Sequence, residues 1–176
     1  MAKKIKAVAI VSFLLTVLCS VLYYYKEWEV ALTFAITFGT IAYHFIMRLV
    51  VGFVLNLIMH NHADYNSFWF RVRKKEFHIY NRLKVKKWKG FMPTYDMSLF
   101  DNKIHTWDEI AQAMCQAELV HEVIVVLSFL PIFAAIPFGA WAVFVITSIL
   151  SAFFDMMFVI MQRYNRSRVV KLLNKR

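Results

Sequence analysis

Long apolar stretches alternate with shorter polar ones along this chain, and four of the apolar stretches are long enough to cross a bilayer. They cover about residues 5–25, 30–55, 119–136 and 140–161, and the second stays largely apolar as far as residue 59. A helix of about 20 apolar residues crosses the roughly 30 Å hydrocarbon core of a membrane. The pattern therefore predicts an all-α membrane protein with four transmembrane helices, forming a single integral membrane domain over residues 1–176.

The junction between the third and fourth stretches contains two prolines and a glycine, Pro131, Pro137 and Gly139. Proline removes a backbone donor and glycine permits a left-handed backbone, so this composition is typical of a tight turn. We expect the last two spans to form a helical hairpin. Its depth in the bilayer stays open.

Composition supports the membrane assignment and identifies the expected partner. Hydrophobic residues make up 60% of the chain and the mean hydropathy is +0.53, whereas soluble domains contain roughly 45–50% apolar residues. The formal net charge is +10. Because the cations flank apolar spans, anionic lipid headgroups are the expected partner and nucleic acid is not.

The placement of the basic residues predicts the orientation of the chain. Three lysines precede the first span, ten Lys and Arg lie between His60 and Glu118, and six follow from Arg163 onward. These are 19 of the 21 basic residues, and only Lys26 and Arg48 lie elsewhere. The positive-inside rule then places both termini and the central loop in the cytoplasm.

The central loop, about residues 60–117, interleaves aromatic residues with these cations. Disordered tails are poor in aromatics, so we expect the loop to be ordered. Trp and Tyr favour the level of the lipid headgroups, where Lys and Arg can extend beside them. The loop is therefore expected to contain one or two amphipathic helices lying at the membrane interface. A plain membrane-binding surface, with no further role, is the alternative.

Three sets of polar residues interrupt the apolar spans, and the members of each set share a helix face. Ionisable residues at such depths are costly and usually face a protein interior or a water-filled cavity, so their convergence indicates a polar pocket in the cytoplasmic half of the bilayer. A structural ion pair between Arg48 and Asp155, with the other residues capping helices, is an equally open alternative. The sets are His44 and Arg48; Glu118, His121 and Glu122; and Asp155, Gln162 and Arg166.

Familiar catalytic motifs are missing from the sequence. There is no G-x-S-x-G nucleophile elbow and no Walker loop. The E-x-x-H at Glu118–His121 occurs once, whereas di-iron bundles need two copies, so no metal and no cofactor are expected. If the chain is an enzyme, His121 beside Glu118 is the best placed pair for general base catalysis.

Three stretches resemble one family of bacterial membrane proteins, the glycosyl-diaponeurosporenoate acyltransferases. Glu76–Pro93 is similar to that family's E-x-x-x-Y-x-x-L-x-x-K-K-W-K-x-x-x-P segment. Ala117–His121 resembles the A-E-L-x-H that opens the family's third span, and Gln162–Arg168 resembles the Q-R-Y-N-R-x-R that closes its last span. The order and spacing agree along about 100 residues, from the central loop to the tail.

The resemblance implies a small polytopic enzyme of the bacterial plasma membrane that esterifies a sugar hydroxyl on a membrane lipid with a fatty acyl chain. Two departures, Glu122 in place of an aromatic residue and Cys115-Gln116 in place of a basic pair, leave the acceptor broad: a glycolipid or an isoprenoid-derived lipid. The resemblance and the intramembrane polar sets together give the candidate binding residues. These are Arg163, Arg166, Asn165, Lys87, Lys89, Trp88, Tyr80, Glu76, Asp155 and Arg48.

The resulting hypothesis is a membrane acyltransferase acting at the cytoplasmic leaflet. His121, oriented by Glu118, is expected to deprotonate the acceptor hydroxyl. Arg163 and Arg166 are expected to hold an acidic headgroup or the oxyanion, and Lys87 with Lys89 the phosphates of the donor. Two alternatives remain: another small lipid-modifying enzyme, of the methyltransferase or reductase type, and a non-catalytic lipid-binding accessory protein.

Overall fold

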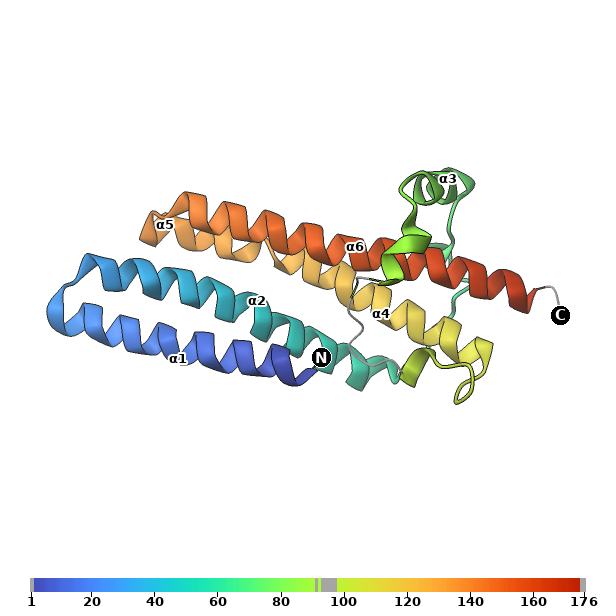
Figure 1. Cartoon of the computed structure of the whole chain (residues 1–176), viewed down its shortest axis with the longest axis horizontal. Helices are drawn as coiled ribbons and strands as arrows, with labels where there is room; N and C mark the ends of the chain where they lie inside the picture. Colours follow the sequence, from blue (N-terminus) through green and yellow to red (C-terminus); the bar gives the residue numbers. More distant parts are fainter. Residues whose placement is uncertain (1, 91, 93–97, 175–176) are drawn as a thin grey trace. The chain divides into compact units, whose positions relative to one another are not determined.

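The computed structural model describes residues 2–90, 92 and 98–174, with the side chains of residues 2, 89 and 90 left out. Within those residues all regular structure is helical (Figure 1). Among these described residues, four helical stretches are long and apolar enough to cross a membrane, which confirms the predicted all-α class and the expected number of candidate spans. They are α1 (Ala2–Lys26), α2 (Glu29–Met59), α4 (Trp107–Leu127) continued by η4 (Leu130–Ala134) and α5 (Ala135–Phe138), and α6 (Trp141–Leu173).

Helix α4 begins at Trp107, well before the predicted third span at residue 119. A capping box starts it, because the Thr106 hydroxyl accepts from the Glu109 backbone N–H while the Glu109 carboxylate accepts from the Thr106 N–H. Ile110 and Met114 then form a buried stripe against Val169 of α6. The final turns of the expected loop are therefore helical and packed.

The third span loses its α-helical form near its end. Helix α4 stops at Leu127, and Pro131 lies in the first turn of the 3₁₀ segment η4, where its missing N–H costs nothing. The chain reverses at Gly139, whose φ of 76° is accessible to glycine without strain. The predicted reversal is present at Gly139, but Pro131 and Pro137 lie in helical turns and not in the turn itself.

The central segment is residues 60–106, between α2 and α4. Its described residues form one short α-helix, α3 (Lys74–Arg82), together with the 3₁₀ turns η1 (Phe68–Phe70), η2 (Val85–Gly90) and η3 (Ser98–Phe100). On α3 the side chains of Phe77 and Tyr80 face the protein, whereas the charged residues of the helix are mostly exposed. The helix is amphipathic, as expected. Its location at a membrane surface stays a prediction.

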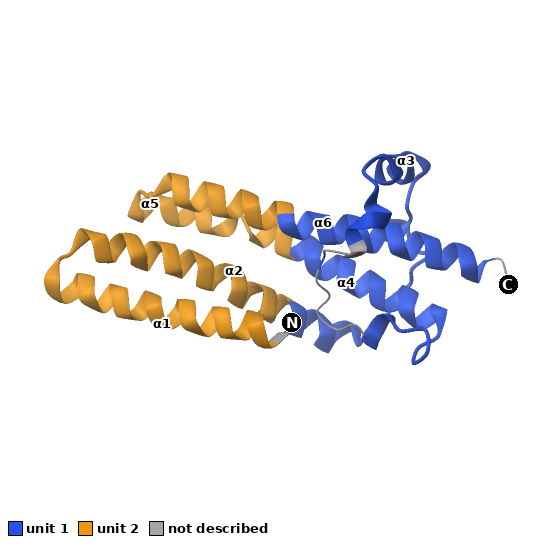
Figure 2. Cartoon of the chain, in the orientation of Figure 1, with its two compact units in different colours: residues 1, 52–123, 154–176 blue, residues 2–51, 124–153 orange. Residues whose placement is uncertain are grey.

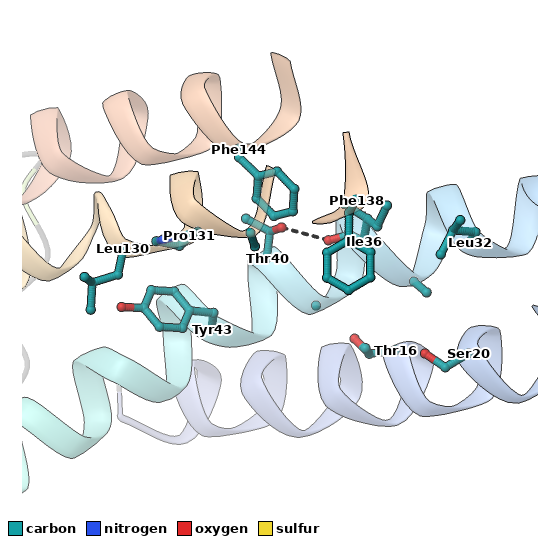
Figure 3. A pocket seen from close by; sticks show the side chains of 13 residues that line it. Thr16, Ser20, Leu32, Ile36, Thr40, Tyr43, Leu130, Pro131, Phe138 and Phe144 are labelled. Atoms are coloured by element: carbon teal, nitrogen blue, oxygen red, sulfur yellow. Dashed lines mark hydrogen bonds between the residues drawn. The ribbon is translucent and has the colours of Figure 1, made fainter. Parts of the chain in front are cut away.

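The chain divides into two compact units, which Figure 2 distinguishes by colour. Unit 2 comprises Ala2–Val51 and Ile124–Phe153. Within it, the hydroxyl of Tyr43 donates a hydrogen bond to the backbone oxygen of Leu127 at 2.8 Å. An elongated cavity lies among α1, α2 and the segment that joins α4 to α6 (Figure 3).

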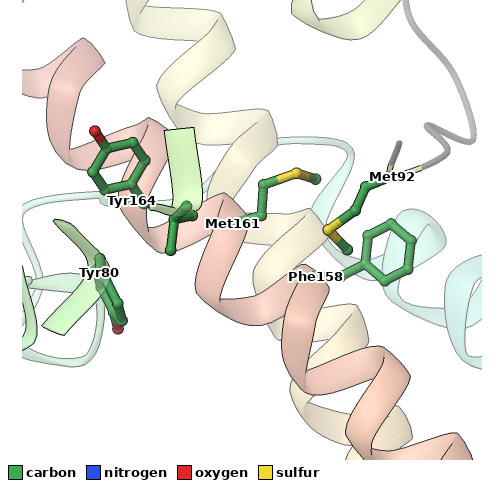
Figure 4. Packing of buried hydrophobic residues seen from close by; sticks show 6 residues of the cluster. Tyr80, Met92, Phe158, Met161 and Tyr164 are labelled. Carbon is green, nitrogen blue, oxygen red and sulfur yellow. The ribbon is translucent and has the colours of Figure 1, made fainter. Parts of the chain in front are cut away.

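Unit 1 comprises Gly52–Val123 and Phe154–Arg176. Its main apolar cluster joins the central segment to α6, and side chains of this cluster appear in Figure 4. Tyr80 of α3 and Val85 of η2 pack here with Phe158, Met161 and Tyr164. This cluster fixes the central segment on the same helix that carries the polar residues described next.

Candidate functional site

The polar centre of unit 1 contains a paired histidine and aspartate on facing helices. Nδ1 of His121 on α4 lies 2.8 Å from Oδ1 of Asp155 on α6. The imidazole stacks on the Phe158 ring, with centroids 4.5 Å apart and planes inclined by 8°. The Asp155 side chain is 1% exposed whereas that of His121 is 23% exposed. The carboxylate is therefore buried behind a histidine that other molecules can reach.

This contact constrains the tautomer of the ring. A carboxylate accepts hydrogen bonds, so Nδ1 of His121 donates to Asp155, and in the neutral ring the lone pair is then on Nε2. Stacking on Phe158 limits rotation of the ring. A histidine held in this way by a carboxylate is the arrangement of a general base.

The structure corrects one expectation from the sequence, namely that Glu118 orients His121. Glu118 lies one turn earlier on α4, but its carboxylate accepts hydrogen bonds from two arginines of α6. Nη1 of Arg163 donates to Oε1 at 3.0 Å, and Nη1 of Arg166 donates to Oε2. Glu118 is fully buried and Arg166 nearly so, at 0% and 1% exposed. The carboxylate that orients His121 is that of Asp155.

The same two arginines also hold the backbone before α3. Arg166 donates through Nη2 to the carbonyl of Phe70 at 2.6 Å, and its guanidinium lies over the Phe70 ring. Arg163 donates through Nη2 to the carbonyls of Trp69 and Arg71, both at 3.4 Å. Most of their donors are therefore used within the protein. These contacts hold the backbone of residues 69–71 in place and leave few donors of the two arginines to bind an anion.

Two further glutamates complete the network around Arg163. Glu76 of α3 and Glu122 of α4 each approach its guanidinium, at 3.4 and 3.5 Å. The indole N–H of Trp69 donates to Glu122 at 2.8 Å, and the hydroxyl of Tyr80 lies 3.4 Å from Glu76. Burial raises the pKa of Tyr80, and the neighbouring charge of Glu76 raises it further. This phenol is therefore a neutral donor at physiological pH.

The other candidates from the sequence occupy different surroundings. Trp88 is half-buried against the apolar cluster of unit 1, Lys87 is exposed and Asn165 is half-buried. Arg48 belongs to unit 2, where it donates to the carbonyl of His44 and to the hydroxyl of Ser151. The side chain of Lys89 lies outside the described residues.

Sequence reasoning missed Trp69 and Phe158 as parts of the site. Phe158 lies one turn after Asp155 on α6, so helical spacing from the aspartate could have indicated it. Trp69 carried no comparable signal, because its partner Glu122 is 53 residues away in sequence. Among the described residues, no group of three or more His, Cys, Asp or Glu is placed to hold a metal ion.

The chain matches the model of a known family. The family model for glycosyl-4,4'-diaponeurosporenoate acyltransferase matches residues 61–175, which include the central segment, α4 and α6. No curated protein and no solved structure matches the chain. The matched region contains the whole His121 and Glu118 network and excludes α1 and α2.

Proposed function

Because the chain belongs to the glycosyl-4,4'-diaponeurosporenoate acyltransferase family, we propose that it transfers a fatty acyl chain to a hydroxyl of a glycolipid or isoprenoid-derived lipid at the cytoplasmic leaflet. The observation that carries this proposal is the contact between His121 and Asp155. It provides a buried carboxylate and an oriented imidazole whose other ring nitrogen, Nε2, can act as a base when the ring is neutral.

In the proposed reaction, Nε2 of His121 accepts the proton of the acceptor hydroxyl while its oxygen attacks the acyl carbonyl carbon of the donor. A new C–O bond forms, the bond from the carbonyl carbon to the donor's leaving group breaks, and the proton passes from Nε2 to that group. Asp155 holds the ring in the required tautomer and stabilises the imidazolium between the two steps, as a buried carboxylate does in other acyl-transfer enzymes.

Glu118 has a positioning role in this proposal. It is the buried counter-charge that Arg163 and Arg166 share, and these arginines hold the carbonyls of residues 69–71 beside the site. The exposed cations of the central segment, Lys87 among them, are then left to bind the phosphates of the donor or of neighbouring lipids. Asn165 and Trp88 are proposed to line the path of the acceptor.

The proposed orientation places both termini and the central segment in the cytoplasm of a bacterial cell. The support is the distribution of charge, since 19 of the 21 Lys and Arg lie in the two terminal regions and the central segment. In that orientation the exposed cations meet the anionic leaflet.

The test compares the lipids of cells that make the protein, its His121→Gln variant or its His105→Gln variant. His105 is a suitable control because it also lies beside a carboxylate, 3.7 Å from Glu109, but outside the network. We expect a new acylated lipid with the unchanged chain and with His105→Gln, and a loss of at least about 100-fold with His121→Gln, the usual minimum for a general base. Full product formation by His121→Gln would refute the mechanism.

A further inference from the structure

The cavity of unit 2 has no part in the reaction chemistry described above. Its volume is about 450 Å³, within the roughly 300–1,000 Å³ typical of small-molecule sites. Residues of α1 and α2 form one side, and η4, α5 and the start of α6 form the other (Figure 3). All of these segments lie in helices that are long and apolar enough to cross a membrane.

The lining is largely hydrocarbon, and apart from Ser20 its hydroxyl groups are hydrogen-bonded within the protein. Thr16 and Thr40 donate their hydroxyls to carbonyls of their own helices, at 2.8 and 2.7 Å. The hydroxyl of Tyr43 donates to Leu127 O. Between these residues the walls are formed by side chains such as Ile36 and Phe144. An occupant of this space is held by dispersion and by exclusion from polar surroundings.

The cavity is long for its volume. Its contacts with α2 run from Leu32 to Tyr43 along a single stripe, which at 1.5 Å per residue is about 16 Å. A largely apolar stripe of that length suits an extended hydrocarbon chain.

Gly39 keeps the middle of the cavity open. A methyl group added there would meet Cγ2 of Thr16 at 3.4 Å, which is ordinary van der Waals contact. An alanine therefore fits at position 39, whereas a branched side chain has to extend into the cavity. Gly52 on the same helix differs, because a methyl group there meets nothing within 4 Å.

We infer that this cavity binds the linear hydrocarbon chain of the acyl donor. The inference rests on the proposed acyltransferase function for the identity of the chain as a donor. The support for binding of a straight alkyl chain comes from the cavity itself, from its largely apolar walls and its length. No polar group of the ligand is required inside it.

The test is photolabelling of the full chain reconstituted in phosphatidylglycerol vesicles. The probe is a palmitic acid analogue with a diazirine near its methyl end, and labelled peptides are mapped by mass spectrometry. We expect labels to concentrate on Leu32–Tyr43 and Leu130–Ala134, and unlabelled palmitate to compete. Gly39→Leu should reduce this labelling at least about tenfold, whereas Gly39→Ala and Gly52→Leu should retain it.

Ala134→Leu adds bulk to the opposite wall of the cavity and is the second variant if Gly39→Leu fails to fold. It should also reduce the labelling. Uniform labelling of lipid-facing surfaces, unchanged labelling in both filled variants, or stronger competition by a branched isoprenoid alcohol would each overturn the inference. Labelling does not depend on turnover, so a protein that binds the probe but makes no acylated lipid would refute the proposed function and leave the cavity's ligand established.

Discussion

Asp155 of α6 accepts a hydrogen bond from Nδ1 of His121 on α4 at 2.8 Å, although 34 residues separate them in sequence. The aspartate is buried and the histidine is not. An acceptor on the buried side leaves the opposite ring nitrogen to take up protons from the accessible side.

Asp155→Asn is therefore expected to impair turnover more than binding. The carboxamide can donate to Nδ1 and so favours the tautomer whose Nε2 is protonated and cannot act as a base. We expect kcat for acyl transfer to fall about 100-fold or more, with KM nearly unchanged. Asp155→Glu, which keeps the acceptor, should restore part of the rate.

The control for this prediction is Asp108→Asn, the same change on α4, where the carboxylate accepts from Tyr65 and Gln112. It should leave kcat near the original value. If Asp155→Asn instead raised KM with kcat intact, Asp155 would bind substrate and would not orient the base.

Glu118→Gln is expected to act mainly on stability. The change leaves Arg163 and Arg166 without their principal buried counter-charge, and breaking a buried ion pair at one partner costs about 3–5 kcal/mol. Glu122→Gln is the matched control one turn further on, since its carboxylate is 20% exposed and 3.5 Å from Arg163; there the expected cost is below about 1 kcal/mol. Thermal unfolding in detergent measures both.

A loss of activity in Glu118→Gln with unchanged thermal stability would contradict this positioning role. Glu118 would then have the catalytic role with His121 that was expected from their spacing.

Arg166→Lys tests the contacts that hold the backbone before α3. Lysine keeps the charge but cannot reach both Glu118 and the Phe70 carbonyl with a planar fork. We expect the bonds after Arg71 and Arg73 to be cut by trypsin about ten times faster, which corresponds to about 1.4 kcal/mol less resistance to local opening. Arg168→Lys, at an exposed position, should leave the cleavage rate unchanged. Equal rates in all three proteins would show that Arg166 does not hold this segment.

Alkaline stability should depend on Tyr65. Its hydroxyl donates to Oδ1 of Asp108 at 2.7 Å, and this hydrogen bond, followed by burial, raises the pKa of the phenol above its ordinary value of 10.0. A raised pKa means that the folded state holds the proton more tightly, so the stabilisation is complete below about pH 10 and is lost as the pH rises further. Tyr65→Phe should be less stable at neutral pH and should lose less stability between about pH 9 and 11. Parallel unfolding curves for the two proteins over that range would contradict this.

The four helices were predictable from sequence because lipid-exposed helices must be apolar over their whole length, and such runs are visible without any tertiary information. Spacing also placed Glu118 with His121 on one face of α4, and Asp155 with Arg166 on one face of α6. The pairing across the helices was not predictable. It depends on how far α4 is shifted along α6, and a shift of one turn would break the contacts of both Glu118 and His121.

The orientation of the spans is tested by accessibility of single cysteines in intact cells. Trp28 lies in the exposed turn between α1 and α2, and Asn102 is exposed in the central segment before α4. Cys19 is changed to serine in both variants, while Cys115 is fully buried and can remain.

With the termini inside, Trp28→Cys should react with a membrane-impermeant maleimide from outside. Asn102→Cys should react only after permeabilisation, because the charges around it hold the central segment on the cytoplasmic side. The reverse pattern would put the exposed cations, and the His121 site with them, at the outer leaflet, where the acyl donor would have to be an extracytoplasmic lipid.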